Sequence, residues 1–257
     1  MPIQPTDDPE VKSMTGIHLY HFSQSNCSMR VRLLLEEKGL PWTSHYIDLM
    51  KGENLTDEYF QIHPHGLVPA IVHDGEIVYE SADILRYLEE KYPEPPMIPA
   101  DQEQRIEMEE WLDITKDIHV KVIKVWVYGK EKLTTKSLES LAEYEKLQPN
   151  QELIDFHKMT LADGHIPQVK IDEAEAELRR LFSRIDKNLE QYEWIAGDTM
   201  TLADIAWIPN YTLLDYNKFP FEDFPRVMEW IGKLTNRPGY EAAVTRWFDY
   251  VPTQDQG

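Results

Sequence analysis

Four polar residues in succession, Ser25 to Ser28, separate a β-prone stretch from a helical pattern. Their hydroxyl, amide and thiol groups can donate hydrogen bonds or react, and a helix start adds backbone N–H groups and a favourable dipole. This combination suits a thiolate or another small anion. We therefore treat Ser25, Asn26 and Cys27 as candidate catalytic residues. Ser28 is a candidate ligand-binding residue, and its hydroxyl also fits the N-cap of the helix.

A second candidate element is the run from His63 to Pro69. Pro69 begins a predicted strand, where a missing N–H does no harm, and its position is one at which we look for a cis peptide bond. A cis bond would leave the backbone N–H and C=O of Val68 free at the sheet edge. An extended peptide could then pair with Val68 as an added strand.

The third element is the pair Glu80-Ser81, at a predicted strand-to-helix turn. Ser81 and its backbone N–H suit a carboxylate at a helix N-terminus, and Glu80 suits an amino group. Together the two residues would hold the head group of a free α-amino acid.

Strands and helices alternate around these three elements. The predicted strands are residues 17–22, 43–49, 69–73 and 76–79, and the predicted helices are residues 28–38, 56–61 and 81–92. Asp74-Gly75 marks a hairpin between the last two strands. The order β-α-β-α-β-β-α describes a small α/β domain with the candidate residues at its turns.

The chain changes character after the proline-rich stretch at 93–99. Helical periodicity then dominates over 102–128, 171–192, 224–235 and 240–247, and Thr201 with Asp204 forms a capping-box pattern before a further helix. We expect an α/β plus all-α fold. The expected division is a flexible tail at 1–15, an α/β domain at 16–93, a Pro-rich linker at 94–102 and a helical domain at 103–257, with an insert near 129–170.

Charge and cysteine content exclude several classes of function. The 257 residues include 26 Lys and Arg against 46 Asp and Glu, a net charge of −20. Such a surface repels phosphate backbones and anionic headgroups, so we expect neither nucleic acid nor membrane partners. The single cysteine forms no intrachain disulfide, and no secretory signal or membrane span is visible. A reducing cytoplasm is the expected location.

The ordered set of motifs resembles the cytosolic glutathione transferases, above all the zeta and tau classes and the ganglioside-induced differentiation-associated relatives. The resemblance covers residues 17 to about 248 and rests on Ser25–Arg32, Pro64–Pro69, Glu80-Ser81 and Gly197–Ala206. It implies a thioredoxin-like first domain, glutathione as co-substrate and a homodimer. It also implies a transferase that attacks a small, mostly apolar or aromatic electrophile.

The resemblance assigns roles to the residues already singled out. Ser25 would hold the glutathione sulfur as a thiolate, Val68 beside a cis Pro69 would pair with the cysteinyl backbone, and Glu80 with Ser81 would hold the γ-glutamyl head. Leu67 stands where many members have a polar residue. The glycyl carboxylate therefore needs another partner, for which we consider the residues His65 and Lys51.

Several alternatives remain open from the sequence. Aryl-ether cleavage, dehalogenation and isomerisation are compatible with the same thiolate, and the scaffold also supports non-catalytic glutathione binding. Cys27 could form a mixed disulfide instead, or fill the core. Arg30 and Arg32 are expected on the helix surface, and Arg30 is also a candidate for stabilising anions near the turn. The acceptor pocket has three candidates that the sequence does not rank, namely His119, Trp126 and Tyr128. No metal site is expected.

Overall fold

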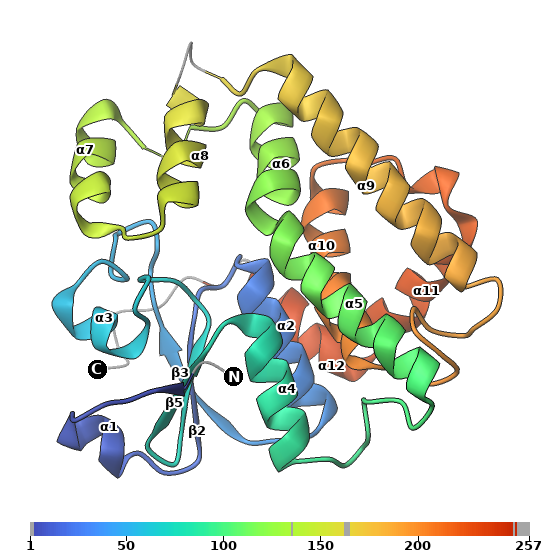
Figure 1. The fold of residues 1–257 in the computed structure, drawn as a ribbon, viewed down its shortest axis with the longest axis horizontal. Coiled ribbons are helices and arrows are strands. Elements are labelled where there is room, and N and C mark those ends of the chain that lie inside the picture. The colour runs from blue at the N-terminus through green and yellow to red at the C-terminus, as the bar shows by residue number, and fades with distance from the viewer. Residues whose placement is uncertain (1–2, 135, 162–164, 249, 251–257) are drawn as a thin grey trace.

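The computed structural model describes residues 3–134, 136–161, 165–248 and 250 (Figure 1). The strands are β1 Ile3–Gln4, β2 Ile17–His21, β3 Trp42–Tyr46, β4 Ala70–His73 and β5 Glu76–Tyr79. The helices are α1 Pro9–Ser13, α2 Asn26–Glu37, α3 Asp57–Ile62, α4 Ser81–Lys91, α5 Gln102–Ile118, α6 Val125–Lys130, α7 Leu138–Leu147, α8 Gln151–Leu161, α9 Gln168–Asn188, α10 Leu202–Tyr216, α11 Pro225–Thr235, α12 Pro238–Tyr240 and α13 Arg246–Phe248. The π-helical stretches are η1 His119–Lys124 and η4 Glu241–Thr245, and a 3₁₀ turn is formed by η3 Phe221–Asp223.

A single mixed sheet carries the α/β domain, in the strand order β1-β5-β4-β2-β3. β2 and β3 are parallel, with Leu19 opposite Ser44, because α2 crosses over between them. β4 runs antiparallel to β2 and to its hairpin partner β5. This thioredoxin-like arrangement is followed, in the described residues after α4, by helices and no further sheet, which confirms the predicted fold class.

The N-terminal segment is not the loose tail that we expected. Ile3 of β1 pairs antiparallel with Val78 of β5, and the Asp8 carboxylate caps α1 by accepting from the Glu10 N–H at 2.8 Å. Val11 is buried against the sheet. Residues 3–13 therefore cover an edge strand that would otherwise be open to pairing, whereas residues 1–2 of the expected tail lie outside the described part.

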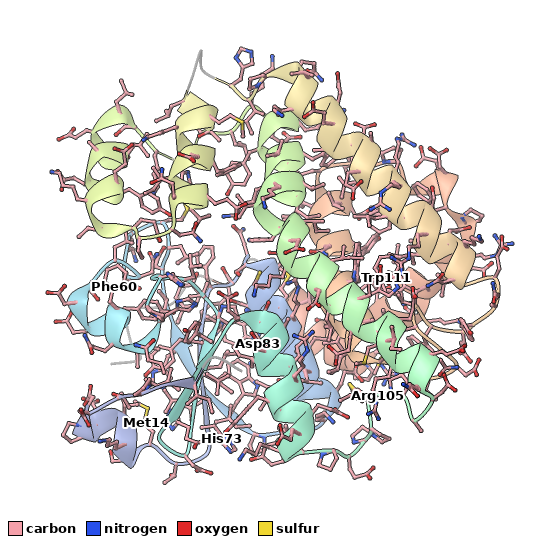
Figure 2. The ribbon with its side chains drawn as sticks, in the orientation of Figure 1. Met14, Phe60, His73, Asp83, Arg105 and Trp111 are labelled. Atoms are coloured by element: carbon pink, nitrogen blue, oxygen red, sulfur yellow. The ribbon has the colours of Figure 1, made fainter. Side chains whose placement is uncertain are left out.

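One hydrophobic core runs across both halves of the chain and joins α2 to α10. Trp111 of α5 points into it and meets Trp207 of α10 edge-on, with ring centroids 5.0 Å apart (Figure 2). The predicted capping box at the start of α10 is confirmed, because Asp204 accepts from the Thr201 N–H at 2.8 Å. Asp204 also accepts from the indole of Trp230 at 2.8 Å, which fixes α11 against α10.

The long helix predicted over 102–128 is interrupted by the π-helical stretch η1. Ile118 and Ile123 are both buried although they are five residues apart, which is the π-helical spacing. α7 and α8 then form a helical pair beside α6 (Figure 1). Leu141 of this pair clusters with Tyr144 and Ile154, and Leu55 of the α/β domain packs against the cluster. Residues 135 and 162–164 of the predicted insert lie outside the described part.

Candidate functional site

Ser25 caps helix α2 at the carboxyl end of strand β2. Its hydroxyl oxygen accepts a hydrogen bond from the Ser28 N–H at 3.2 Å. The hydroxyl proton is not used in that bond, so it remains a donor toward the space in front of the helix. Ser28 is therefore not the N-cap that the sequence suggested. It lies buried in the first turn, where its hydroxyl accepts from the Phe22 N–H at 3.3 Å.

Asn26 and Cys27 follow the cap and point in different directions. The Asn26 side chain is buried and donates to Asn210 Oδ1 of α10 at 2.9 Å, so it joins the two domains. Its own oxygen accepts from the Cys27 N–H at 3.0 Å. The Cys27 thiol is half-buried and is not part of a disulfide. Within this turn, the side chains of Ser25 and Cys27 make no hydrogen bond to the sheet or to α10 in the described part of the chain.

Arg30 is buried, not on the helix surface as predicted. Its guanidinium donates to the Ala206 carbonyl at 3.0 Å, to the Ser81 hydroxyl at 3.2 Å and to Asn210 Oδ1 at 3.1 Å. No carboxylate pairs with it among the described residues. Burial lowers the pKa of Arg30, and a thiolate at Cys27 would act in the opposite direction. Arg30 therefore supplies positive potential between the starts of α2 and α4.

Arg32 is the second correction, because it too is buried. It donates to the Ala243 carbonyl at 2.7 Å and to His21 Nδ1 at 3.1 Å, and its guanidinium lies over the ring of Trp247. Burial lowers its pKa to about 9. Burial, together with the charge of Arg32, lowers the pKa of His21 to about 2, so this imidazole is neutral. Arg32 thus fastens the C-terminal helices to the α/β domain.

The Val68–Pro69 peptide bond is cis, as expected for this position. The loop before it is held by two short bonds to its carbonyls, from Asn54 to Gly66 and from Tyr59 to Leu67, each at 2.6 Å. Val68 itself makes no backbone hydrogen bond within the described residues, since the β4 ladder begins at Ala70. The Val68 N–H and C=O therefore remain open to an extended ligand.

The two candidate partners for a second carboxylate differ in their surroundings. Lys51 is exposed and pairs with Asp48 at 3.1 Å, which raises the pKa of the lysine. His65 follows a buried His63 in the same loop, and its Nδ1 atom is buried with no partner in the described part of the chain. Leu67 is half-buried and contributes its carbonyl to the loop, not its side chain.

Glu80 occupies the position before helix α4 in a conformation that non-glycine residues rarely adopt, with φ of 69°. Its carboxylate makes no hydrogen bond or ion pair to the described residues. Ser81 is the first helical residue and not the cap, and its hydroxyl accepts from Arg30. With no side chain capping α4, the N–H groups of its first turn are left for an anion.

The structure separates the three aromatic and imidazole candidates of the acceptor side. Trp126 is fully buried, donates to Glu175 at 3.1 Å and belongs to the helical core. Tyr128 is half-buried and meets Phe156 of α8 edge-on at 5.2 Å. The Nδ1 atom of His119 is buried and has no hydrogen-bond partner among the residues that the structure describes, and burial holds the pKa of His119 well below the usual value.

Sequence reasoning missed Lys124 and Lys136 on this acceptor side. Lys124 ends η1 with its Nζ 5.6 Å from the centre of the Phe156 ring, and Lys136 lies with its Nζ 4.1 Å from the centre of the Tyr144 ring. The sequence does contain an indication of Lys124, because this lysine interrupts an otherwise apolar stretch between Val122 and Val127.

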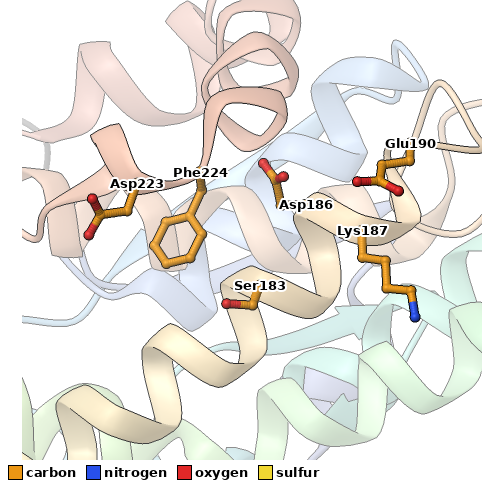
Figure 3. Close-up of a pocket in the computed structure, with 6 residues that line it drawn as sticks. All are labelled: Ser183, Asp186, Lys187, Glu190, Asp223 and Phe224. Carbon is orange, nitrogen blue, oxygen red and sulfur yellow. The ribbon is translucent and has the colours of Figure 1, made fainter.

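A separate depression lies where α9 meets the segment that leads into α11 (Figure 3). It has a volume of about 380 Å³, and it is lined by Ser183, Asp186, Lys187, Glu190, Asp223 and Phe224. Its carboxylates are already engaged: Asp186 accepts from the Arg226 and Val227 N–H groups at the start of α11, and Asp223 pairs with Arg179. These contacts are structural.

Comparison with known proteins decides the family. A protein-family model described as "Glutathione S-transferase, N-terminal domain" matches residues 19–96. A second family model, described as "Glutathione S-transferase, C-terminal domain", matches residues 159–238. A zeta-class glutathione S-transferase of Euphorbia esula is 31% identical over 195 residues, which are 75% of this chain and 73% of the relative. The chain belongs to the glutathione S-transferase family. Glutathione is the co-substrate that this family binds, and the predicted resemblance is confirmed.

Other known proteins align over more of the chain. LigF of Sphingobium sp. SYK-6 is 27% identical over 256 residues, covering 93% of this chain and 95% of LigF. The crystal structure of that protein, described as a β-etherase, superposes with a TM-score of 0.76 over 91% of this chain and 99% of LigF, at 26% identity. Glutathione-bound Ure2p superposes with a TM-score of 0.70 at 19% identity, over 90% of this chain and 94% of Ure2p, and shows the fold alone. No helix within the described ranges is long and apolar enough to cross a membrane.

Proposed function

We propose that this chain activates the thiol of glutathione at Ser25 and transfers the thiolate to a small, mostly apolar or aromatic electrophile. The observation that carries the proposal is the unused hydroxyl proton of Ser25 at the start of α2. A charge-assisted hydrogen bond contributes roughly 1.5–3 kcal/mol, and lowering a pKa by one pH unit takes about 1.4 kcal/mol. One serine is therefore sufficient to favour the thiolate at neutral pH.

The rest of glutathione would lie along the edge of the sheet. Its cysteinyl backbone would pair with the open N–H and C=O of Val68, and its γ-glutamyl carboxylate would accept from the uncapped first turn of α4 and from Ser81. The unpaired Glu80 carboxylate would hold the amino group. The buried, unpaired charge of Arg30 supplies positive potential to a co-substrate that is a net anion, against the −20 of the whole chain.

The chemical step is then a nucleophilic substitution. The sulfur of glutathione forms a bond to carbon, the bond from carbon to the leaving group breaks, and that group departs with the electron pair. Asn26 takes no direct part in this proposal, because its side chain is bound to α10. Cys27 remains a second candidate partner for sulfur through a mixed disulfide.

Cleavage of an aryl ether is the second candidate reaction. It is favoured by the similarity to LigF, which extends through residues 97–158, where neither family model matches. In that reaction the thiolate would attack the ether carbon and a phenolate would leave. A homodimer and a cytoplasmic location stay predictions, the former tested by sedimentation of the purified chain.

Calorimetry of glutathione binding tests the proposal directly. We expect saturable binding by the wild-type chain, and turnover of an activated aryl chloride that depends on glutathione. The absence of binding would overturn the proposal, whereas binding without turnover of a broad panel of electrophiles would favour a non-catalytic protein. Mass spectrometry after exposure to oxidised glutathione distinguishes the third option, since only a reactive Cys27 adds the mass of one glutathione.

A further inference from the structure

Two partly buried lysines on the acceptor side of the site have no acidic partner among the described residues. The other lysine that is withdrawn from solvent does have one. Three lysines of the described residues are not exposed, namely Lys38, Lys124 and Lys136. Lys38 pairs with Glu89 at 2.6 Å and donates to two backbone carbonyls. Lys124 and Lys136 have neither an ion pair nor a hydrogen bond within the described part, although the chain holds 46 acidic residues.

The first of the two, Lys124, is the last residue of η1 and is partly withdrawn from solvent. A thiolate at Cys27, two residues after Ser25, would raise the pKa of Lys124, so the ammonium is within electrostatic range of the first turn of α2. Burial acts in the opposite direction and dominates. Beside it, Phe156 presents its ring to the ammonium at 5.6 Å.

The second, Lys136, approaches the same place from the loop before α7. The Tyr144 ring under Lys136 meets His157 at 5.1 Å, and His157 meets the Phe156 ring beside Lys124 at 5.3 Å, so one continuous run of rings links the two ammonium groups. The charge of Lys136 also lowers the pKa of Lys124. Both also act on His157 of α8, whose pKa falls to about 3, mainly through burial. Two like charges held together with no carboxylate between them repel, and a bound anion would relieve that repulsion.

Aromatic rings surround the two ammonium groups. The ring of Tyr144 lies 4.1 Å below Lys136 Nζ, and the rings of Tyr128, Phe156 and His157 continue edge-to-face along α6 and α8. Apolar ring faces suit a flat ligand, and ammonium groups suit a carboxylate. A merely structural cation–π contact would account for one lysine on one ring, not for two lysines on one continuous run of rings.

From this juxtaposition we propose that Lys124 and Lys136 bind the carboxylate of an aromatic electrophile, so that the preferred substrates are aromatic acids. The inference rests on the proposed function for the attacking thiolate, but it concerns residues that the thiolate does not use. The lysines lie at positions 124 and 136, outside both stretches that the family models match.

The test compares an acid with its neutral amide, 4-chloro-3-nitrobenzoate with 4-chloro-3-nitrobenzamide, in glutathione conjugation. Glutathione sulfur replaces chloride in both, so the ratio of the two kcat/KM values isolates the carboxylate. The variants are Lys124→Met and Lys136→Met. Lys124→Arg keeps the charge. The matched control is Lys121→Met, also on η1, where the lysine is exposed and pairs with Glu152 at 3.3 Å.

We expect Lys124→Met and Lys136→Met each to lower the acid-to-amide ratio about tenfold, since a charge-assisted hydrogen bond is lost. Lys124→Arg and Lys121→Met should leave the ratio within about twofold, as ordinary surface or charge-conserving changes do. An unchanged ratio in both methionine variants, or equal losses for acid and amide, would overturn the inference.

A binding measurement without glutathione keeps this inference apart from the proposed function. Calorimetry with unreactive 3-nitrobenzoate should give a Kd that rises about tenfold in Lys124→Met, while 3-nitrobenzamide binds each variant alike. If the chain failed to bind glutathione, this result would still support the carboxylate site. If glutathione turnover were intact and 3-nitrobenzoate did not bind the wild-type chain, the inference alone would fall.

Discussion

The guanidinium of Arg30, inside α2, donates to the hydroxyl of Ser81, the first residue of α4, over 3.2 Å. This bond connects the helix start that faces the expected sulfur to the helix start that faces the expected amino-acid head. Because Arg30 also donates to the Ala206 carbonyl and to Asn210 of α10, one buried cation aligns both helix starts with the helical domain. Its charge is not neutralised by a carboxylate of the described chain.

Replacing this arginine is expected to destabilise the protein strongly. Arg30→Met leaves the Ala206 carbonyl and the Ser81 hydroxyl buried without their donor, which should cost about 3–5 kcal/mol of unfolding free energy. Chemical denaturation measures the loss. The control Arg180→Met removes an exposed pair with Glu177 and should cost less than about 1 kcal/mol. A cost below about 1 kcal/mol for Arg30→Met would contradict the role given to it.

The donor role of Ser25 is separable from its role as a helix cap. Ser25→Asp retains a capping acceptor but offers no hydrogen to a thiolate, whereas Ser25→Thr retains both. We expect Ser25→Asp to raise the pKa of the bound glutathione thiol by about 1 to 2 pH units, from the energy of one charge-assisted bond. Thiolate absorbance against pH measures it.

The stability of the two variants serves as the control. Ser25→Asp and Ser25→Thr should unfold within about 1 kcal/mol of the wild-type chain because the cap is kept. An unaltered thiol pKa in Ser25→Asp would rule out the serine as the activating group and would favour Cys27 as the partner of the glutathione sulfur.

Gly66 has a specific steric role in the loop before Val68. Its φ of 55° favours glycine, and a Cβ atom there would lie 2.6 Å from the Asn54 carbonyl oxygen. Gly66→Ala should therefore shift the loop and weaken glutathione binding about tenfold or more, on the order of the 1.4 kcal/mol that one hydrogen bond contributes. Gly52→Ala is the matched control, since Gly52 has a φ of 76° but an open surrounding. Equal glutathione affinities in both variants would contradict this reading.

Buried histidines make the fold sensitive to acid. Burial and the neighbouring His65 lower the pKa of His63 to about 3, from an ordinary value of about 6.5. Between these pH values the unfolded chain binds a proton that the folded chain does not. The contribution of His63 to the free energy of unfolding is therefore complete above about pH 6.5 and is lost progressively as the pH falls. Each such histidine contributes a slope of about 1.4 kcal/mol per pH unit.

The histidine slope is measured by denaturant unfolding at several pH values between 4 and 7. In His63→Gln, the slope of the unfolding free energy against pH should fall by the contribution of one histidine, about 1.4 kcal/mol per pH unit. His165→Gln changes an exposed imidazole and should leave the slope as it is. A slope that His63→Gln does not alter would show that other groups govern acid sensitivity.

Local signals in the sequence were sufficient for much of the fold. The hairpin over β4 and β5 follows from alternating apolar residues around Asp74-Gly75, and the capping box of Thr201 and Asp204 is a contact within one helical turn. Such features depend on residues close in the chain, so their order and spacing identify them. The family resemblance rests on the same local motifs.

Contacts between distant segments decided what the sequence left open. Arg30 and Arg32 read as surface charges because nothing in α2 itself shows that α10 and η4 cover its outer face. The sequence did not show that Lys124 and Lys136 belong to one group of residues. The π-helical stretch η1 changes which side of the continuous helix from α5 to α6 faces inward. By itself the sequence determined the order of the strands and helices from β2 to α4 and the helix start that suits a thiolate. Only tertiary packing decided which charges are buried, since desolvation and pairing depend on what the rest of the chain brings beside them.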